Sequence, residues 1–131
     1  MTPLLYSVSS GNMPITVELL RAKADPNISD YRGITALMIA ASLGDLAHCR
    51  ILVKVNANID FVDHNGWSAL HYGAFSGSVD VCDFLLDQGV DKDLKDLKRR
   101  KAIHVARFMG HGVVVAYLEG YRRRIGNRHI L

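Results

Sequence analysis

The amino-acid sequence predicts an all-α solenoid of stacked helix-turn-helix units, each with a projecting turn. The first observation is a 33-residue period, kept by the glycines Gly11, Gly44, Gly77 and Gly110. The leucines Leu19, Leu52, Leu85 and Leu118 repeat with the same step. The second observation is that the helical patterns within each period are short. Because short helices cannot bury an apolar face alone, neighbouring units must stack on each other.

The second period shows how one unit is built. Residues Thr35–Gly44 are predicted to form a short helix, with Thr35 as N-cap and Gly44 as the C-terminal stop. Asp45 opens a second helix, in which apolar residues recur at helical spacing on one face. Residues 56–58 end that helix, and Asp60–Gly66 is predicted to be an extended arm with a tight turn.

Two segments carry a shared motif, Asp30-Tyr31-Arg32-Gly33-Ile34-Thr35-Ala36-Leu37 and Asp63-His64-Asn65-Gly66-Trp67-Ser68-Ala69-Leu70-His71. A third copy, residues 96–104, is degenerate. These segments resemble the ankyrin repeat family, whose pattern runs roughly D-x-x-G-x-T-P-L-H. The resemblance covers Thr2 to about Gly120. It implies a single ankyrin-repeat domain over residues 1–131, with repeats at about 2–33, 34–66, 67–99 and 100–120 and a basic tail at 121–131.

Some positions depart from the family pattern. The resemblance implies that the motif histidine ties neighbouring turns together, and this role falls on His71 and His104. The first two repeats have Leu5 and Met38 there and must do without those bonds. At Arg99-Arg100-Lys101 the turn glycine and the threonine cap are both missing, so we expect a strained or more mobile turn there.

Composition excludes several classes of protein. The 131 residues are 49% hydrophobic and 22% charged, with a mean hydropathy of +0.08, as in one globular domain. No apolar stretch approaches the roughly 18 to 20 residues of a membrane span, and the N-terminus lacks the features of a secretory signal. These features predict an intracellular protein, cytoplasmic or nuclear. We expect either a monomer or part of a larger assembly, and the start inside a repeat is also compatible with a fragment of a larger protein.

The sequence predicts no catalytic activity, no metal site and no cofactor site. Cys49 and Cys82 lie one period apart on inward helix faces, about one helix spacing from each other, and are expected to be buried free thiols. The histidines share no ligand spacing with these cysteines. Gly110-His111-Gly112 joins two predicted helices without a preceding strand, so it is not a phosphate loop. The serines and aspartates lie at caps and turns.

The resemblance implies a non-catalytic protein–protein interaction module that binds its partner in a concave groove, at the turn tips and along the first helices. The groove positions are predicted to be Tyr31, Arg32, Ile34, Leu43, His64, Asn65, Trp67, Phe75, Lys98, Arg100, Phe108 and Met109. Exposed aromatic residues beside arginines are typical of interface anchors. We expect Trp67 to be such an anchor, so that Trp67→Ala leaves thermal unfolding nearly unchanged. The alternative is that these residues pack on adjacent turns to stiffen the stack.

The charge is uneven along the chain. The overall charge is +3, yet the residues after Asp96 include nine basic side chains against Glu119 alone. This basic end predicts an acidic surface on a protein partner. The alternative, which the sequence favours less, is binding of nucleic acid or another polyanion through residues 98–101 and Arg122, Arg123 and Arg124.

The outer face of each end unit of a solenoid must either be polar or be covered by another part of the molecule. The first repeat is expected to present polar residues outward, namely Ser7, Ser9, Ser10, Thr16, Glu18 and Arg21. The last helix contains Val113–Leu118, which is apolar on all sides. We expect that Ile125, Ile130 and Leu131, a further domain or a second copy of the chain covers this helix.

Overall fold

The computed structural model describes residues 1–122, which form eight α-helices in four pairs. The first helices of the pairs are α1 (Pro3–Ser9), α3 (Ala36–Ser42), α5 (Ala69–Ser76) and α7 (Ala102–Phe108). The second helices are α2 (Met13–Arg21), α4 (Leu46–Lys54), α6 (Val79–Asp87) and α8 (Gly112–Gly120). No β-strand occurs within residues 1–122, so the predicted all-α stack is confirmed. None of these helices is long and apolar enough to cross a membrane.

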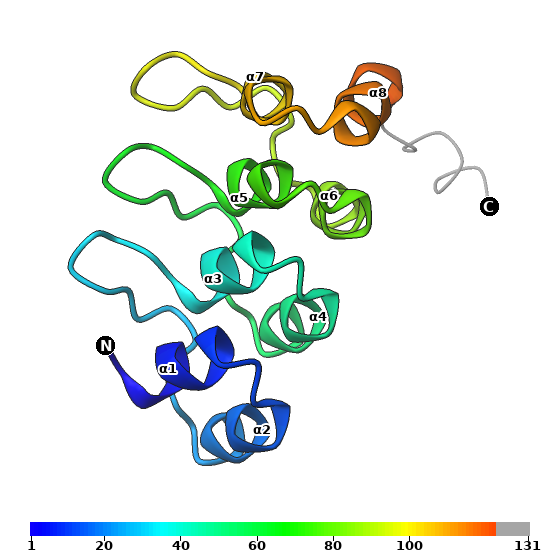
Figure 1. Ribbon diagram of the computed structural model, residues 1–131. Helices are drawn as coiled ribbons and strands as arrows, with labels where there is room; N and C mark the ends of the chain where they lie inside the picture. Colours follow the sequence, from blue (N-terminus) through cyan, green and yellow to red (C-terminus); the bar gives the residue numbers. More distant parts are fainter. Residues whose placement is uncertain (123–131) are drawn as a thin grey trace.

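The four pairs are stacked in a row (Figure 1). The first helices pack on one another in the order α1, α3, α5, α7, and each also packs on the second helix of its own pair. Small side chains such as Ala40, Ala74 and Ala106 are fully buried where the helices meet, while Leu52 and Leu85 are buried on the second helices. The apolar core is therefore a continuous ribbon along the stack, to which every unit contributes the same few positions.

The predicted caps are present. The hydroxyl of Thr35 accepts a hydrogen bond from the Met38 amide at the start of α3, and Asp45 accepts one from the His48 amide at the start of α4. At α7, Lys101 supplies no side-chain cap. That helix begins without the hydroxyl that the other first helices have.

Three loops, residues 22–35, 55–68 and 88–101, connect the pairs and project on the side of the first helices (Figure 1). Each contains a β-turn that starts at an aspartate, as when the Gly66 amide donates to the Asp63 carbonyl over 2.9 Å. Neighbouring loops are also joined directly, because the Leu97 amide donates to the Asn65 carbonyl over 3.1 Å. The projecting turns expected from the sequence are therefore confirmed, and they form a connected row.

The degenerate third loop keeps the same turn without a glycine. Arg99 adopts a φ of 63°, close to the 78° of Gly66 at the equivalent place. A non-glycine residue in this left-handed region costs on the order of 1 kcal/mol, which is the strain expected there. A Cβ on Gly66 would lie 2.9 Å from the Leu97 backbone nitrogen of the following loop. Because no described loop follows Arg99, a side chain fits at this last turn.

The expected polar face of the first unit is partly wrong. Ser7 and Thr16 are fully buried, whereas Ser9, Ser10, Glu18 and Arg21 are exposed. The two buried hydroxyls are hydrogen-bonded to each other over 2.8 Å, and the Thr16 hydroxyl is also hydrogen-bonded to His48 Nε2 over 2.9 Å. His48 Nδ1 in turn lies 2.7 Å from Asp45. These side chains face the second unit, where hydrogen bonds compensate for their removal from water.

The last helix, α8, is buried on one face only. Val114 and Leu118 are buried against the rest of the stack, but Val113 is 74% exposed. The residues that were expected to cover α8, Ile125, Ile130 and Leu131, lie outside the described part of the chain.

The two cysteines are buried free thiols, as predicted. Burial raises the pKa of Cys49 and of Cys82 to about 12, so both stay protonated at neutral pH. Within residues 1–122, no group of three His, Cys, Asp or Glu side chains is arranged to hold a metal ion.

Candidate functional site

Two adjoining clefts lie where the second and third loops meet helices α5 and α7. The apolar cleft has a volume of about 310 Å³ and is lined by Trp67, Phe75, Arg100, His104, Val105, Phe108 and Met109. The polar cleft has a volume of about 240 Å³ and is lined by Asn65, Trp67, Tyr72, Leu97, Lys98 and Arg100. Trp67 and Arg100 belong to both clefts, so these two side chains form the wall between them.

Trp67 is partly buried. Its ring stacks on His71, with centroids 5.8 Å apart, and meets Tyr72 edge-on at 5.0 Å. Its indole nitrogen donates a hydrogen bond to the Asp96 carboxylate over 2.9 Å, which joins the second loop to the third. Because the ring packs on its own helix and bonds across the units, Trp67→Ala should also destabilise the fold. Its remaining surface lines both clefts.

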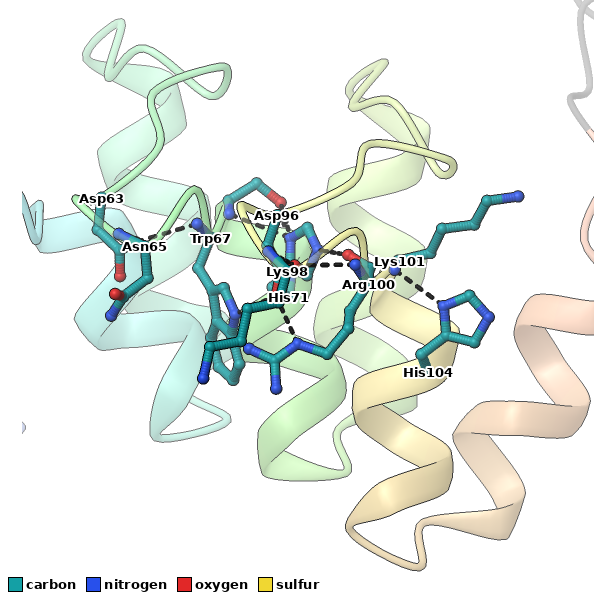
Figure 2. Close-up of polar contacts among 10 residues, drawn as sticks. Asp63, Asn65, Trp67, His71, Asp96, Lys98, Arg100, Lys101 and His104 are labelled. Atoms are coloured by element: carbon teal, nitrogen blue, oxygen red, sulfur yellow. Dashed lines mark hydrogen bonds and ion pairs between the residues drawn. The ribbon is translucent and has the colours of Figure 1, made fainter.

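The Asp96 carboxylate organises the wall (Figure 2). One oxygen accepts the backbone amides of Lys98 and Arg100, each over 2.8 Å, and the other accepts Arg100 Nε and the Trp67 indole. Burial by itself would raise the pKa of Asp96, but the hydrogen bonds outweigh it and lower the pKa to about 2. The carboxylate is therefore ionised and directed into the loop rather than toward solvent.

Arg100 is held from three directions. Its Nε bonds Asp96 over 2.8 Å, and its guanidinium carbon lies 5.9 Å from the centre of the Trp67 ring. Its backbone carbonyl is bonded to His71 Nε2 over 2.9 Å. The Ser68 amide donates to His71 Nδ1, so the Nε2 atom carries the proton of the neutral ring and donates to Arg100. Burial lowers the pKa of His71, which keeps the ring neutral.

The bond from His71 to the next loop confirms the tying role that the resemblance implied. His104 behaves differently, because its ring is exposed and its Nδ1 accepts only the Lys101 amide of its own unit. Figure 2 shows the two histidines at equivalent places on successive units. His104 therefore lines the apolar cleft instead of joining two loops.

The apolar cleft carries large exposed side chains. Phe108 is 89% exposed, and Phe75 and Met109 are each 39% exposed. Phe75 and Phe108 occupy the same position in successive units, and the Phe75 ring lies 5.9 Å from Trp67. A solvated phenylalanine beside an apolar hollow is a surface from which a partner can exclude water.

The exposed charge around the clefts is positive. Lys98, Arg99 and Arg107 are exposed, and no described residue forms an ion pair with any of them. The turn aspartates Asp63 and Asp96 are buried, and their oxygens accept hydrogen bonds from their own loops. The two turn aspartates beside the clefts are thus hidden from solvent, whereas Lys98, Arg99 and Arg107 are exposed.

The structure gathers some of the predicted groove residues and not others. Those that line the two clefts are Asn65, Trp67, Phe75, Lys98, Arg100, Phe108 and Met109. Those that lie outside both clefts are Tyr31, Arg32, Ile34, Leu43 and His64. Most of this second group is exposed, but Ile34 is partly buried.

Besides Leu97, which lies next to the predicted Lys98, three cleft residues, Tyr72, His104 and Val105, were missed from the sequence. Tyr72 and Val105 could have been found, since each lies three residues before a phenylalanine and therefore on the same helix face. Burial and a hydrogen bond to Asp63 raise the pKa of Tyr72 well above its ordinary range, so its hydroxyl stays neutral and acts as the donor. His104 carried no such signal, because its motif position implied a structural bond.

Comparison with known proteins agrees with the stacked helix pairs and the bonded loops. A sequence model for ankyrin repeats (three copies) matches residues 4–96, which is more than half of the chain. No curated protein matches the chain significantly. The matched region contains helices α1 to α6 and most of the third loop. The chain therefore belongs to the ankyrin repeat family.

Proposed function

We propose that the chain is a non-catalytic module that binds a protein partner at the apolar and polar clefts. Ankyrin repeats are generally protein–protein interaction modules and are typically non-catalytic. The observation that carries the proposal is the exposure of Phe108, at 89%, beside an apolar hollow already lined by Trp67 and Phe75. Covering such a ring removes apolar surface from water, which is the main favourable contribution to most protein associations.

The charge around the clefts supports an acidic partner. Lys98 lines the polar cleft, Arg99 is exposed on the same loop and Arg107 is exposed on α7, while the turn aspartates Asp63 and Asp96 are buried. Complementary charge raises the rate of encounter and selects among partners more than it adds affinity. We therefore expect the partner's contact surface to be acidic, and the association rate to fall as salt is added.

The test compares two matched apolar truncations of the chain. Binders are first selected from a displayed library of protein fragments, and their affinity is then measured by calorimetry. Phe108→Ala should weaken binding by about tenfold or more, because the ring loses its buried contact. Val113→Ala truncates another exposed apolar side chain, 74% exposed and on the outer helix α8, and should leave the affinity unchanged.

The fluorescence of Trp67, the chain's single tryptophan, reports occupancy of either cleft. A protein fragment that occupies either cleft should change the Trp67 emission. Binders that lose affinity with Val113→Ala, keep it with Phe108→Ala and leave the emission unchanged would place the interaction on the outer helices and contradict the proposal.

Polyanion binding by the basic end is not favoured by an observation in the structure. Residues 98–101 lie on the third loop and Arg122 follows α8, but Arg123 and Arg124 lie outside the described residues. Such binding would be recognised by a steep fall in affinity for any oligonucleotide as salt is added, with the logarithm of the affinity linear in the logarithm of the salt concentration.

A further inference from the structure

We propose that the polar cleft binds an aspartate or glutamate side chain of the partner, placed beside an apolar anchor residue that occupies the apolar cleft. This inference rests on the proposed function and adds the chemical class of the recognised segment. It divides the groove into an anion subsite and an apolar subsite, with Trp67 and Arg100 between them.

The polar cleft presents uncommitted donors from two successive loops. Lys98 is exposed, and its ammonium group forms no ion pair within residues 1–122. Arg100 uses only Nε on Asp96, so its two Nη groups have no partner among the described residues. Asn65 uses its backbone for the neighbouring loop, while its side-chain amide makes no bond to a described residue. All three residues line one cleft of about 240 Å³.

The Arg100 donor is already in place before a ligand arrives. Asp96 and the Trp67 ring fix the Arg100 guanidinium, and His71 fixes the Arg100 backbone. In Figure 2 the side chains of Lys98 and Arg100 extend beside the Trp67 indole, whereas Lys101 extends away from it. Lys101 instead pairs with Asp93 over 3.4 Å. A fixed donor loses little conformational freedom on binding, which favours affinity.

The amount of charge fits a carboxylate better than a phosphate. Asp96 already balances part of the Arg100 charge, so Lys98 supplies the one unshared cation that lines the cleft. A carboxylate carries one negative charge and matches the planar fork of a guanidinium. A phosphate group carries about two negative charges at neutral pH and is usually met by a cluster of arginines.

The shared wall fixes the spacing of the recognised segment. In an extended chain, residues i and i+2 point to the same side and lie about 7 Å apart. Because one indole and one guanidinium separate the clefts, the acidic side chain should lie within about two residues of the apolar anchor. The recognised segment is therefore an extended peptide with a large apolar residue and a nearby aspartate or glutamate.

The experiment selects binders from a random, unmodified peptide library with the full chain, and repeats the selection with two charge reversals. Wild-type binders should carry a large apolar residue with an acidic residue within about two positions. Lys98→Glu should abolish the acidic preference and weaken the best wild-type peptide by about tenfold. Lys54→Glu, at an exposed site on the outer helix α4, is the matched control and should select the same peptides as wild type.

A second measurement distinguishes a failure of the carboxylate subsite from a failure of the proposed groove binding. Replacing the acidic residue of a wild-type peptide by lysine should weaken binding to the wild-type chain and restore binding to Lys98→Glu. Peptides that quench Trp67 and depend on Phe108 but carry no acidic residue would overturn the carboxylate subsite while leaving the groove intact. Selected peptides that bind the chain much more tightly once their acidic residue is replaced by phosphoserine would also overturn it. Peptides whose binding is changed neither by Phe108→Ala nor by Lys98→Glu would overturn the proposed function itself.

Discussion

Single carboxylates show how much one residue contributes to this fold. Asp30, Asp63 and Asp96 occupy the same position in three loops, and each accepts two backbone amides of its own turn. They differ in what the second oxygen does. For Asp30 it pairs with the exposed Arg32, whereas for Asp96 it accepts both Arg100 and the Trp67 indole. The motif aspartate therefore bonds only within its own loop at Asp30, whereas at Asp96 its hydrogen bonds join two repeats.

Acid should remove the contribution of Asp96 to stability. Its pKa is lowered to about 2, from an ordinary value of about 3.9, so its stabilisation is present above pH 4 and is lost as the pH falls toward 2. The free energy involved is on the order of 2 kcal/mol. Asp96→Asn should reduce the stability at pH 6 and flatten its decline between pH 5 and pH 2, measured by urea unfolding followed by circular dichroism.

Asp30→Asn is the control for this measurement. It changes an equivalent carboxylate whose side-chain partner, Arg32, is exposed and which bonds no tryptophan. It should cost less stability than Asp96→Asn. If Asp96→Asn kept the wild-type pH profile, the hydrogen bonds around Asp96 would not be the source of acid sensitivity.

At the level of the loops, glycine is needed only where another loop follows. Gly66 has a φ of 78°, and a Cβ there would also collide with the backbone of the third loop. Arg99 holds the same backbone conformation in the last described loop without that collision. The missing glycine of the third motif copy is therefore explained by its place in the stack.

Gly66→Ala and Arg99→Gly should have opposite effects on stability. Gly66→Ala combines a left-handed φ with a close contact and should destabilise the chain by about 2 kcal/mol or more. Arg99→Gly relieves the left-handed strain, but it also increases the entropy of the unfolded chain, so its effect should lie between zero and a gain of about 1 kcal/mol. Thermal unfolding of both variants measures this. Equal losses would show that the following loop does not decide the role of glycine.

The helices and loops followed from local rules in the sequence. Thr35 and Asp45 could be recognised as caps because a short polar side chain before an apolar periodic run satisfies free backbone amides. The burial of Ser7 and Thr16 could not be predicted in this way. Whether a hydroxyl faces solvent or His48 depends on how two units pack, and each residue alone suits a surface equally well.

Over the whole molecule, the place of a unit in the stack decides how deeply its residues are buried. Ile15, His48, Val81 and Val114 occupy one equivalent position in the four units. The last three are almost completely buried, but Ile15 in the first unit is 48% exposed. No helix pair among residues 1–122 packs on that side of Ile15.

Truncation at this position should therefore give a graded response. Val81→Ala removes fully buried methyl groups and should cost about 2 kcal/mol, because the lost burial and the resulting cavity add together. Ile15→Ala removes more atoms but should cost less, since its side chain is half exposed. Urea unfolding of the two variants measures the difference. A larger loss for Ile15→Ala would mean that its side chain is covered in solution.

The sequence alone determined the period, the helix pairs, the caps and the family, because those features depend on residues close together in one chain segment. It also picked out Phe75, Phe108 and Lys98, which line the two clefts. Only the tertiary structure showed that Trp67 is partly buried and bonded to Asp96, which lies 29 residues away. The two clefts and their shared wall exist only where successive units meet. Their geometry depends on how far one unit is displaced from the next, and the repeat pattern does not contain that distance.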